Sequence, residues 1–220
     1  MTERWASFDC YGTLIDWERG IMDAFVGLWP DVDPSELLEH YHEAEKQIER
    51  GSGEPYRDVL RATLRATADA AALTVAGGRE DALSVSLPEW PPFPETTEAL
   101  TELRERGWKL AILSNTDPEL LDASIRRMEI DIDLRITVAE AGSYKPAHGH
   151  WQRFVAETGV GSDRHVHVAA SLFHDIAPAR ELGLRCVWIN REAETTGLGP
   201  DAELPDLRGL ADTLDALVGG

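Results

Sequence analysis

Four short segments of the chain carry side chains that could act together in a reaction. They hold a carboxylate with a hydroxyl, a second hydroxyl with an amide, a lysine, and a hydroxyl with another carboxylate, in the order Asp9 and Thr13, Ser114 and Asn115, Lys145, Ser171 and Asp175. A carboxylate that attacks carbon or phosphorus forms an ester or acyl phosphate, which water later removes. A lysine holds such a carboxylate ionised, and nearby N–H groups bind developing negative charge. Taken singly, each polar residue is more often a helix cap or turn former.

These segments follow stretches that the pattern predicts to be buried strands. Apolar runs at 5–8, 109–113, 166–170 and 186–189, with a short strand near 135–138, alternate with helical patterns at 95–106, 118–128, 147–158 and 176–182. A last amphipathic helix is expected at 205–217. Such alternation predicts an α/β fold, a Rossmann-like, mainly parallel sheet with helices on both faces. Ligands of such sheets bind outside the carboxyl ends of the strands.

The segment from 16 to 87 has a different pattern. Apolar residues recur there at helical spacing, no strong strand occurs, Pro34 suits a helix start, and Gly51-Ser52-Gly53 suits a break. A proline-rich linker at 88–94 follows. We therefore expect a core made of residues 1–15 and 88–220, with a helical cap at 16–87 inserted after the first strand.

Composition narrows the classes of function. The net charge of −19 disfavours binding to nucleic acid or to an anionic membrane. No apolar run approaches the ~20 residues that cross a bilayer. The two cysteines, Cys10 and Cys186, lie in apolar runs without metal-ligand spacing. These features predict a cytoplasmic protein with reduced thiols.

The four segments resemble the motifs of one known family. FDCYGTL at 8–14, LSNT at 113–116, YKP at 144–146 and AASLFHD at 169–175 are similar, in order and spacing, to the four motifs of the haloacid dehalogenase superfamily. The resemblance spans residues from about 5 to 190. It implies that Asp9 is the nucleophile, that Thr13 and Ser114 bind the anionic part of the substrate, and that Lys145 balances the charge around Asp9.

Two positions favour the 2-haloacid dehalogenases over the phosphatases of this superfamily. The phosphatases have an acid two residues after the nucleophile and a magnesium-binding carboxylate before the serine of the fourth motif, whereas this chain has Tyr11 and Ala170. Halide leaves without being protonated, so neither carboxylate is needed. The resemblance thus implies hydrolysis of a carbon–halogen bond, with no metal and no cofactor, on a small halogenated carboxylic acid.

The implied reaction assigns the remaining residues. Asp9 displaces halide from the α-carbon, and water activated near Asp175 and Lys145 hydrolyses the ester, with Thr13 completing the catalytic set. Expected substrate contacts, the halide surroundings included, are Cys10, Tyr11, Ser114, Asn115, Ser171 and His174. Cys10 lies beside the nucleophile but is better explained as a small strand residue that points away from the site. Apolar cap residues are expected around the halide.

The chain departs from the dehalogenase pattern at several places. No arginine stands in the cap where the family has its halide-binding one; His42 stands there, and Arg50 and Arg57 are the nearest arginines. Trp151 replaces a tyrosine. His174, adjacent to Asp175, either tunes or relays the proton of ester hydrolysis or is merely hydrogen-bonded at a helix start. Two histidine pairs, at 148 and 150 and at 165 and 167, are considered as metal ligands, and no metal is assigned to them.

Two alternatives stay open. One is a phosphatase that holds Mg²⁺ through Asp9 and Asp175, and the other is a catalytically silent module that binds a small acid or a protein. The intact set of Asp9, Lys145 and Asp175 counts against the second. A homodimer is implied by resemblance alone.

Overall fold

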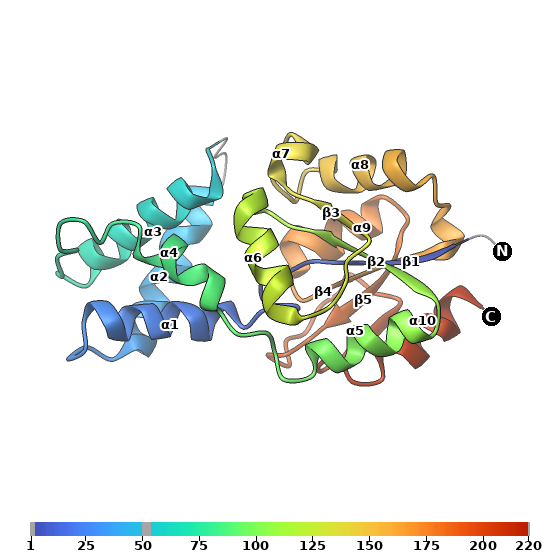
Figure 1. Cartoon of the computed structure of the whole chain (residues 1–220), viewed down its shortest axis with the longest axis horizontal. Coiled ribbons are helices and arrows are strands. Elements are labelled where there is room, and N and C mark those ends of the chain that lie inside the picture. The colour runs from blue at the N-terminus through green and yellow to red at the C-terminus, as the bar shows by residue number, and fades with distance from the viewer. Residues whose placement is uncertain (1–2, 50–53, 220) are drawn as a thin grey trace. The chain divides into compact units, whose positions relative to one another are not determined.

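The computed structural model describes residues 3–49 and 54–219. Its centre is a six-stranded sheet in the order β3-β2-β1-β4-β5-β6, in which all neighbouring strands are parallel (Figure 1). The strands are β1 (Arg4–Phe8), β2 (Trp108–Leu113), β3 (Leu134–Ile136), β4 (His165–Ala169), β5 (Arg185–Ile189) and β6 (Ala202–Leu204). The predicted parallel α/β sheet is confirmed.

The register of the central strands brings the functional segments to one edge. Phe8, the last residue of β1, lies opposite Ile112 of β2 and Val168 of β4. The residues that follow these positions, including Asp9 and Ser114, therefore leave the sheet at the same level. β1, β2 and β4 consist almost wholly of buried residues, as expected for parallel strands covered on both faces.

Helices cover both faces of the sheet (Figure 1). On one face, α8 and α9 pack on the strands through Trp151, Phe154, Ile176 and Trp188. On the other, α5 packs on β2, and α10 packs on α5 and β4. The helices of this unit are α5 (Thr96–Glu105), α7 (Val138–Ala141), η2 (Ser162–Arg164), α8 (Gly149–Thr158), the π-helical turn η3 (Leu172–Ile176), α9 (Ala177–Glu181) and α10 (Leu210–Val218).

The remaining helices form a second compact unit. It comprises residues 16–91 and 116–127, and the sheet unit comprises 1–15, 92–115 and 128–220. The helices of the second unit are α1 (Trp17–Leu28), α2 (Pro34–Glu49), α3 (Tyr56–Ala70), α4 (Ala82–Ser86), η1 (Leu87–Glu89) and α6 (Pro118–Met128), whose last residue is grouped with the sheet unit. The expected cap at 16–87 thus differs in extent, because the structure groups most of α6 with these helices.

A close approach fixes the packing inside the helical unit. A Cβ atom on Gly20 of α1 would lie 2.2 Å from Cγ of Trp90, so only glycine fits there without movement of the ring. The break predicted at 51–53 lies outside the described residues. Within the described part of the chain, no helix is long and apolar enough to cross a membrane.

Several element boundaries differ from the sequence-based expectations. The helix expected at 176–182 is shorter and follows the π-helical turn η3, because Ser171 accepts a hydrogen bond from the His174 N–H. The helix expected from 205 begins only at Leu210, after Gly209 at a φ of 73°. The edge strand β6 and the short helix α7 were not expected from the sequence.

Candidate active site

Asp9 begins a tight loop that positions the expected nucleophile. Its backbone N–H donates to the Val168 carbonyl at 3.1 Å, which ties the end of β1 to β4. We call residues 10–15 the nucleophile loop. Its Cys10 carbonyl accepts from the backbone N–H groups of Leu14 and Ile15 at 2.8 and 3.0 Å. Gly12 has a φ of 90°, a conformation that favours glycine. The loop therefore turns directly back after the carboxylate.

Thr13 connects this loop to the end of β4. Its hydroxyl donates to Oδ2 of Asp9 at 3.1 Å and accepts the backbone N–H of Ala170 at 2.9 Å. The Trp188 indole donates to the Ala170 carbonyl at 3.0 Å. Thr13 thus orients one carboxylate oxygen of Asp9. Its expected contact with the anionic part of the substrate stays a prediction.

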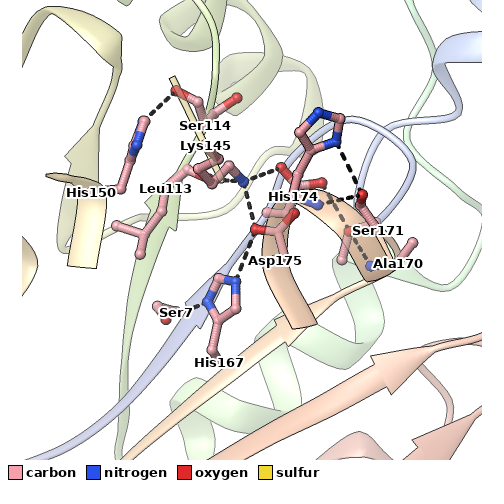
Figure 2. Close-up of polar contacts among 12 residues, drawn as sticks. Ser7, Leu113, Ser114, Lys145, His150, His167, Ala170, Ser171, His174 and Asp175 are labelled. Atoms are coloured by element: carbon pink, nitrogen blue, oxygen red, sulfur yellow. Dashed lines mark hydrogen bonds and ion pairs between the residues drawn. The ribbon is translucent and has the colours of Figure 1, made fainter. Parts of the chain in front are cut away.

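Lys145 lies between the two expected catalytic carboxylates. Its ammonium donates to Oδ1 of Asp9 at 2.8 Å, to Oδ1 of Asp175 at 2.6 Å and to the Leu113 carbonyl at 2.9 Å (Figure 2). An ammonium has three N–H donors, so all are used. The side chains of Lys145 and Asp175 are each 1% exposed, and that of Asp9 is 12% exposed. The structure therefore brings Asp9, Lys145 and Asp175 together in a nearly fully buried site, in which the Asp9 side chain is the most exposed of the three.

The charges of this trio control one another. Burial has the largest effect on the pKa of Asp9 and raises it, Lys145 lowers it, and the charge of Asp175 raises it, so that this pKa lies above its usual value. Burial also raises the pKa of Asp175, but Lys145 and a hydrogen bond from His167 outweigh it and hold this pKa below its usual value. The two carboxylates raise the pKa of Lys145 despite its burial. Lys145 is therefore a permanent cation, and Asp175 is ionised at neutral pH.

Asn115 holds the backbone of Lys145. Its Oδ1 accepts the Lys145 backbone N–H at 2.6 Å, and its Nδ2 donates to the Lys145 carbonyl at 3.1 Å. This pairing fixes the segment that carries the lysine. The Ser114 backbone N–H donates to the Ile136 carbonyl at 3.0 Å, so this N–H does not serve as an anion donor. The Ser114 side chain remains the candidate for the expected contact with a substrate carboxylate.

His150 supports Ser114 from behind. Its Nε2 lies 3.1 Å from the Ser114 carbonyl and must be the donor, because a carbonyl only accepts (Figure 2). Burial and the charge of Lys145 together lower the pKa of His150 to about 4. His150 is therefore a neutral, structural residue.

Ser171 and His174 contact each other. The Ser171 hydroxyl caps η3 by accepting the His174 backbone N–H at 3.1 Å, and it lies 3.1 Å from the His174 ring atom Nδ1. A π-helical turn at this position is typical of functional sites. His174 is thus hydrogen-bonded at the start of η3, which was one of its two expected roles. The substrate contacts expected of Ser171 and His174 stay predictions.

Cys10 and Tyr11 flank the nucleophile in different surroundings. Cys10 is fully buried, and burial raises the pKa of its thiol well above the usual value, so the thiol stays protonated. Its backbone N–H lowers the pKa of Asp9 through a hydrogen bond. Tyr11 is half-buried. Their expected substrate contacts also stay predictions.

The helical unit holds the residues that were considered for the halide. His42 Nε2 lies 3.1 Å from a carboxylate oxygen of Glu18, and its ring packs on Trp17. The Arg57 side chain, 49% exposed, pairs with Asp117 and Glu119 at 3.3 and 3.5 Å. Arg50 lies outside the described residues. Acidic partners around His42 and Arg57 are the arrangement expected of surface charges.

Arg191, which the sequence pattern does not mark as a site residue, holds the nucleophile loop. Arg191, just after β5, donates to the Gly12 and Thr13 carbonyls at 3.2 and 2.9 Å and to Glu95 at 2.9 Å. Its guanidinium lies 3.5 Å from the centre of the Phe93 ring. No motif marks such an arginine, because its acceptors are backbone carbonyls far away in the sequence.

His167 is the second missed residue. Its Nε2 lies 3.0 Å from Oδ1 of Asp175, and its Nδ1 lies 2.8 Å from the Ser7 hydroxyl (Figure 2). The alternation of His165 and His167 along β4 is the sequence signal for this residue, and it suggests metal ligands rather than a contact with Asp175. The His167 imidazole thus contacts Asp175 directly.

The site residues do not fit a magnesium ion. Mg²⁺ prefers several anionic oxygens in octahedral geometry. Here the Lys145 ammonium already binds Oδ1 of both carboxylates, and the position before Ser171 is Ala170, which has no ligand atom in its side chain. Among residues 3–49 and 54–219, no group of three or more His, Cys, Asp or Glu side chains is arranged to hold a metal.

Comparison with known proteins places this geometry in a family. Residues 4–215 match the model of the family described as haloacid dehalogenase-like hydrolase. An (S)-2-haloacid dehalogenase of Pseudomonas sp. (strain YL) is 30% identical, and the match covers 97% of this chain and 95% of that protein. The (S)-2-haloacid dehalogenase 4A of Burkholderia cepacia is 26% identical, with 96% and 91% covered. The crystal structure of an L-2-haloacid dehalogenase, 26% identical, superposes with a TM-score of 0.86 over 98% of this chain and 100% of that one.

Proposed function

Because this chain belongs to the haloacid dehalogenase-like hydrolases, we propose that it hydrolyses short 2-haloacids to 2-hydroxyacids through an ester on Asp9. One observation carries the proposal. The Lys145 ammonium binds both Asp9 and Asp175, while Tyr11 and Ala170 stand where a phosphatase has its leaving-group acid and its metal ligand. The site thus offers a carboxylate nucleophile paired with an ammonium and a second carboxylate as a base, and Tyr11 stands at the position of the phosphatases' leaving-group acid.

The first step forms the ester. A carboxylate oxygen of Asp9 attacks the α-carbon, the new C–O bond forms as the carbon–halogen bond breaks, and halide leaves with the electron pair. No proton is transferred in this step. Thr13 and Lys145, which contact the two Asp9 oxygens, hold the carboxylate in one orientation, and this orientation lowers the entropic cost of attack.

The second step hydrolyses the ester at the Asp9 carbonyl. Asp175 takes a proton from water as the water oxygen adds to the carbonyl carbon, and it returns this proton to the alkoxide oxygen as the C–O bond to the substrate breaks and the 2-hydroxyacid leaves. The Asp9 carboxyl that remains loses its proton to solvent. Lys145 stabilises the negative charge that develops on the Asp9 oxygen, since its N–H already contacts Oδ1. The cycle consumes one water and releases one halide and one proton, and it regenerates Asp9.

The substrate carboxylate needs a hydrogen-bond donor that is not already used to bind the Asp9 carboxylate. We assign this role to the Ser114 side chain, which is nearly fully buried beside the end of β2. The enzyme would act in the cytoplasm on a free small acid, without a metal or cofactor. A homodimer stays a prediction, which light scattering coupled to gel filtration tests directly.

Halide release tests the proposal. We expect chloride from chloroacetate and from one enantiomer of 2-chloropropanoate, at the same rate with and without EDTA. Asp9→Asn should abolish release, whereas Asp23→Asn, an exposed aspartate on α1, should not change it. Intact-mass spectrometry of the quenched enzyme should show the substrate-derived adduct on the wild type only.

Two results would overturn the proposal. If no haloacid released halide, the dehalogenase assignment would fail, and phosphate esters with Mg²⁺ would be the next substrates. If EDTA abolished release, the metal-independent mechanism would fail.

A further inference from the structure

A chain of buried polar side chains continues from Asp175 into the sheet. His165 Nε2 lies 2.7 Å from the Ser7 hydroxyl, which lies 2.8 Å from His167 Nδ1, and His167 Nε2 lies 3.0 Å from Oδ1 of Asp175. Ser7 pairs with His167 in the register of β1 and β4. All four side chains are at most 1% exposed. Three polar residues in the middle of a parallel sheet are costly unless they serve each other or the site.

The direction of one hydrogen bond in this chain follows from its two partners. Asp175 is ionised and only accepts, so His167 Nε2 carries the proton. The directions of the two hydrogen bonds of Ser7 depend on the tautomers of His165 and His167. In one arrangement His165 Nε2 donates to the Ser7 oxygen, and the Ser7 hydroxyl donates to His167 Nδ1. The chain ends at His165 Nδ1, a buried atom without a partner among the described residues.

The other arrangement keeps the same contact with Asp175. If His167 Nδ1 donates to the Ser7 oxygen, the Ser7 hydroxyl donates to His165 Nε2, and His167 Nε2 still donates to Oδ1 of Asp175. The titratable groups around His167 are His165, Asp175, Lys145 and His150. Burial lowers the pKa of His165 to about 3, and this keeps the far end of the chain neutral.

Packing fixes the rings in place. The edge of Trp151 meets His167 at 5.3 Å between centroids with an interplanar angle of 78°. Phe154 lies against His165 at 4.4 Å. These contacts favour the ring orientation in which His167 Nε2 lies against Oδ1 of Asp175.

The two oxygens of Asp175 consequently differ. Oδ1 accepts from both Lys145 and His167, whereas Oδ2 is buried and has no partner among the described residues. A buried carboxylate oxygen without a partner is unusual, because its desolvation is uncompensated. It is the group of the site with spare capacity to bind and deprotonate a water molecule.

We propose that His167, oriented by Ser7 and His165, is a positioning residue for ester hydrolysis, which holds Asp175 so that Oδ2 is left to activate the water. The inference rests on the proposed function. The proton of the attacking water goes to Oδ2, while the His167 N–H stays on Oδ1. His167 does not contact Asp9, so it acts on the second step and not on halide displacement.

The test separates the two steps. His167→Leu removes the donor, His167→Gln keeps an N–H near the position of Nε2, and His148→Leu is the matched exposed control. We expect His167→Leu to release about one equivalent of halide at the wild-type rate and then to turn over roughly 10- to 100-fold more slowly, the loss of one hydrogen bond to a charged group. The covalent ester should accumulate in intact-mass spectra, and His167→Gln should restore most of the turnover.

The pH profile gives a readout that a general structural role would not move. Without the His167 donor, the ionised form of Asp175 loses stabilisation, so its pKa rises. The acidic limb of ester hydrolysis in His167→Leu should therefore shift to higher pH, with the limb of the halide burst unchanged. If His167→Leu lost the burst and the turnover equally, or kept both, the inference would fail.

A measurement on the unmodified protein tests the hydrogen-bond chain even if the variants fold poorly. In ¹⁵N NMR spectra of the substrate-free enzyme, Nε2 of His167 should carry a proton. A His167 whose only ring proton is on Nδ1 would overturn the inference. Absence of halide release by the wild type would instead overturn the proposed function, so the two failures are distinguishable.

Discussion

Replacement of Lys145 by methionine tests the central charge balance of the site. The Lys145 nitrogen lies 2.8 Å from Asp9 and 2.6 Å from Asp175. At an effective dielectric constant of about 20, a pair of unit charges about 2.8 Å apart attracts by roughly 6 kcal/mol, which corresponds to about 4 pKa units. Without the ammonium, the two carboxylates become a like-charged buried pair, and one of them takes up a proton near neutral pH.

We expect Lys145→Met to slow the halide burst by about 100-fold or more at pH 7, because part of Asp9 is then protonated. The acidic limb of the burst should shift to higher pH. Stopped-flow halide detection between about pH 5 and 9 measures both, with the exposed Lys109→Met as control, since its side chain is 42% exposed.

Stability should follow the same charges with a defined sign. In Lys145→Met the folded-state pKa values of Asp9 and Asp175 lie above their unfolded values, so their contribution to stability is present at low pH and lost as pH rises. We expect a loss of about 3–5 kcal/mol at pH 8, and a smaller loss at pH 5, in urea titrations. A variant with the wild-type burst rate and pH profile would refute the idea that Lys145 keeps Asp9 ionised.

Three further substitutions test other parts of the structure. Arg191→Leu should lower kcat about tenfold and stability by about 1–3 kcal/mol, because the nucleophile loop loses its carbonyl contacts; unchanged kinetics and urea unfolding would contradict this. Asp133→Asn should cost about 1–2 kcal/mol at pH 7, since backbone and basic partners outweigh burial and depress the pKa of Asp133. That stabilisation is present above the unfolded pKa of about 3.9 and lost as pH falls, so an equal loss at pH 3 would disprove it. Gly20→Ala should destabilise by about 1–3 kcal/mol through its clash with Trp90, whereas Gly27→Ala, with no atom within 4 Å of the new Cβ, should stabilise by about 0.5–1 kcal/mol; thermal unfolding shifts of the same sign would argue against this packing.

The sheet and the catalytic trio were accessible from the sequence because they rest on strong local signals. Each central strand is a continuous apolar run, and Asp9, Lys145 and Asp175 lie in motifs of recognisable order. The fold class and the family resemblance are both confirmed. The edge strand β6 was missed because Ala202–Leu204 is short and half-polar, so only its pairing with β5 identifies it.

The residues that support the trio were hidden for another reason. His167 and Ser7 are separated by 160 positions, and their contact follows from the neighbouring places of β1 and β4 in the sheet. Periodicity shows that both are buried and says nothing of which strands adjoin. Arg191 binds carbonyl oxygens, which every residue possesses, so no side-chain pattern could mark its targets.

The anchoring of the nucleophile loop and of the β4 end has a consequence for the evolution of new chemistry. Arg191 holds the loop through carbonyls, and Ala170 is held through its own N–H and carbonyl by Thr13 and Trp188. The backbone at Ala170, and at Gly12 and Thr13 next to Tyr11, is therefore held by contacts to main-chain atoms. We expect that exchange of the Tyr11 and Ala170 side chains changes the reactivity of the site more than the path of its backbone, so that one scaffold could serve enzymes that cleave different bonds.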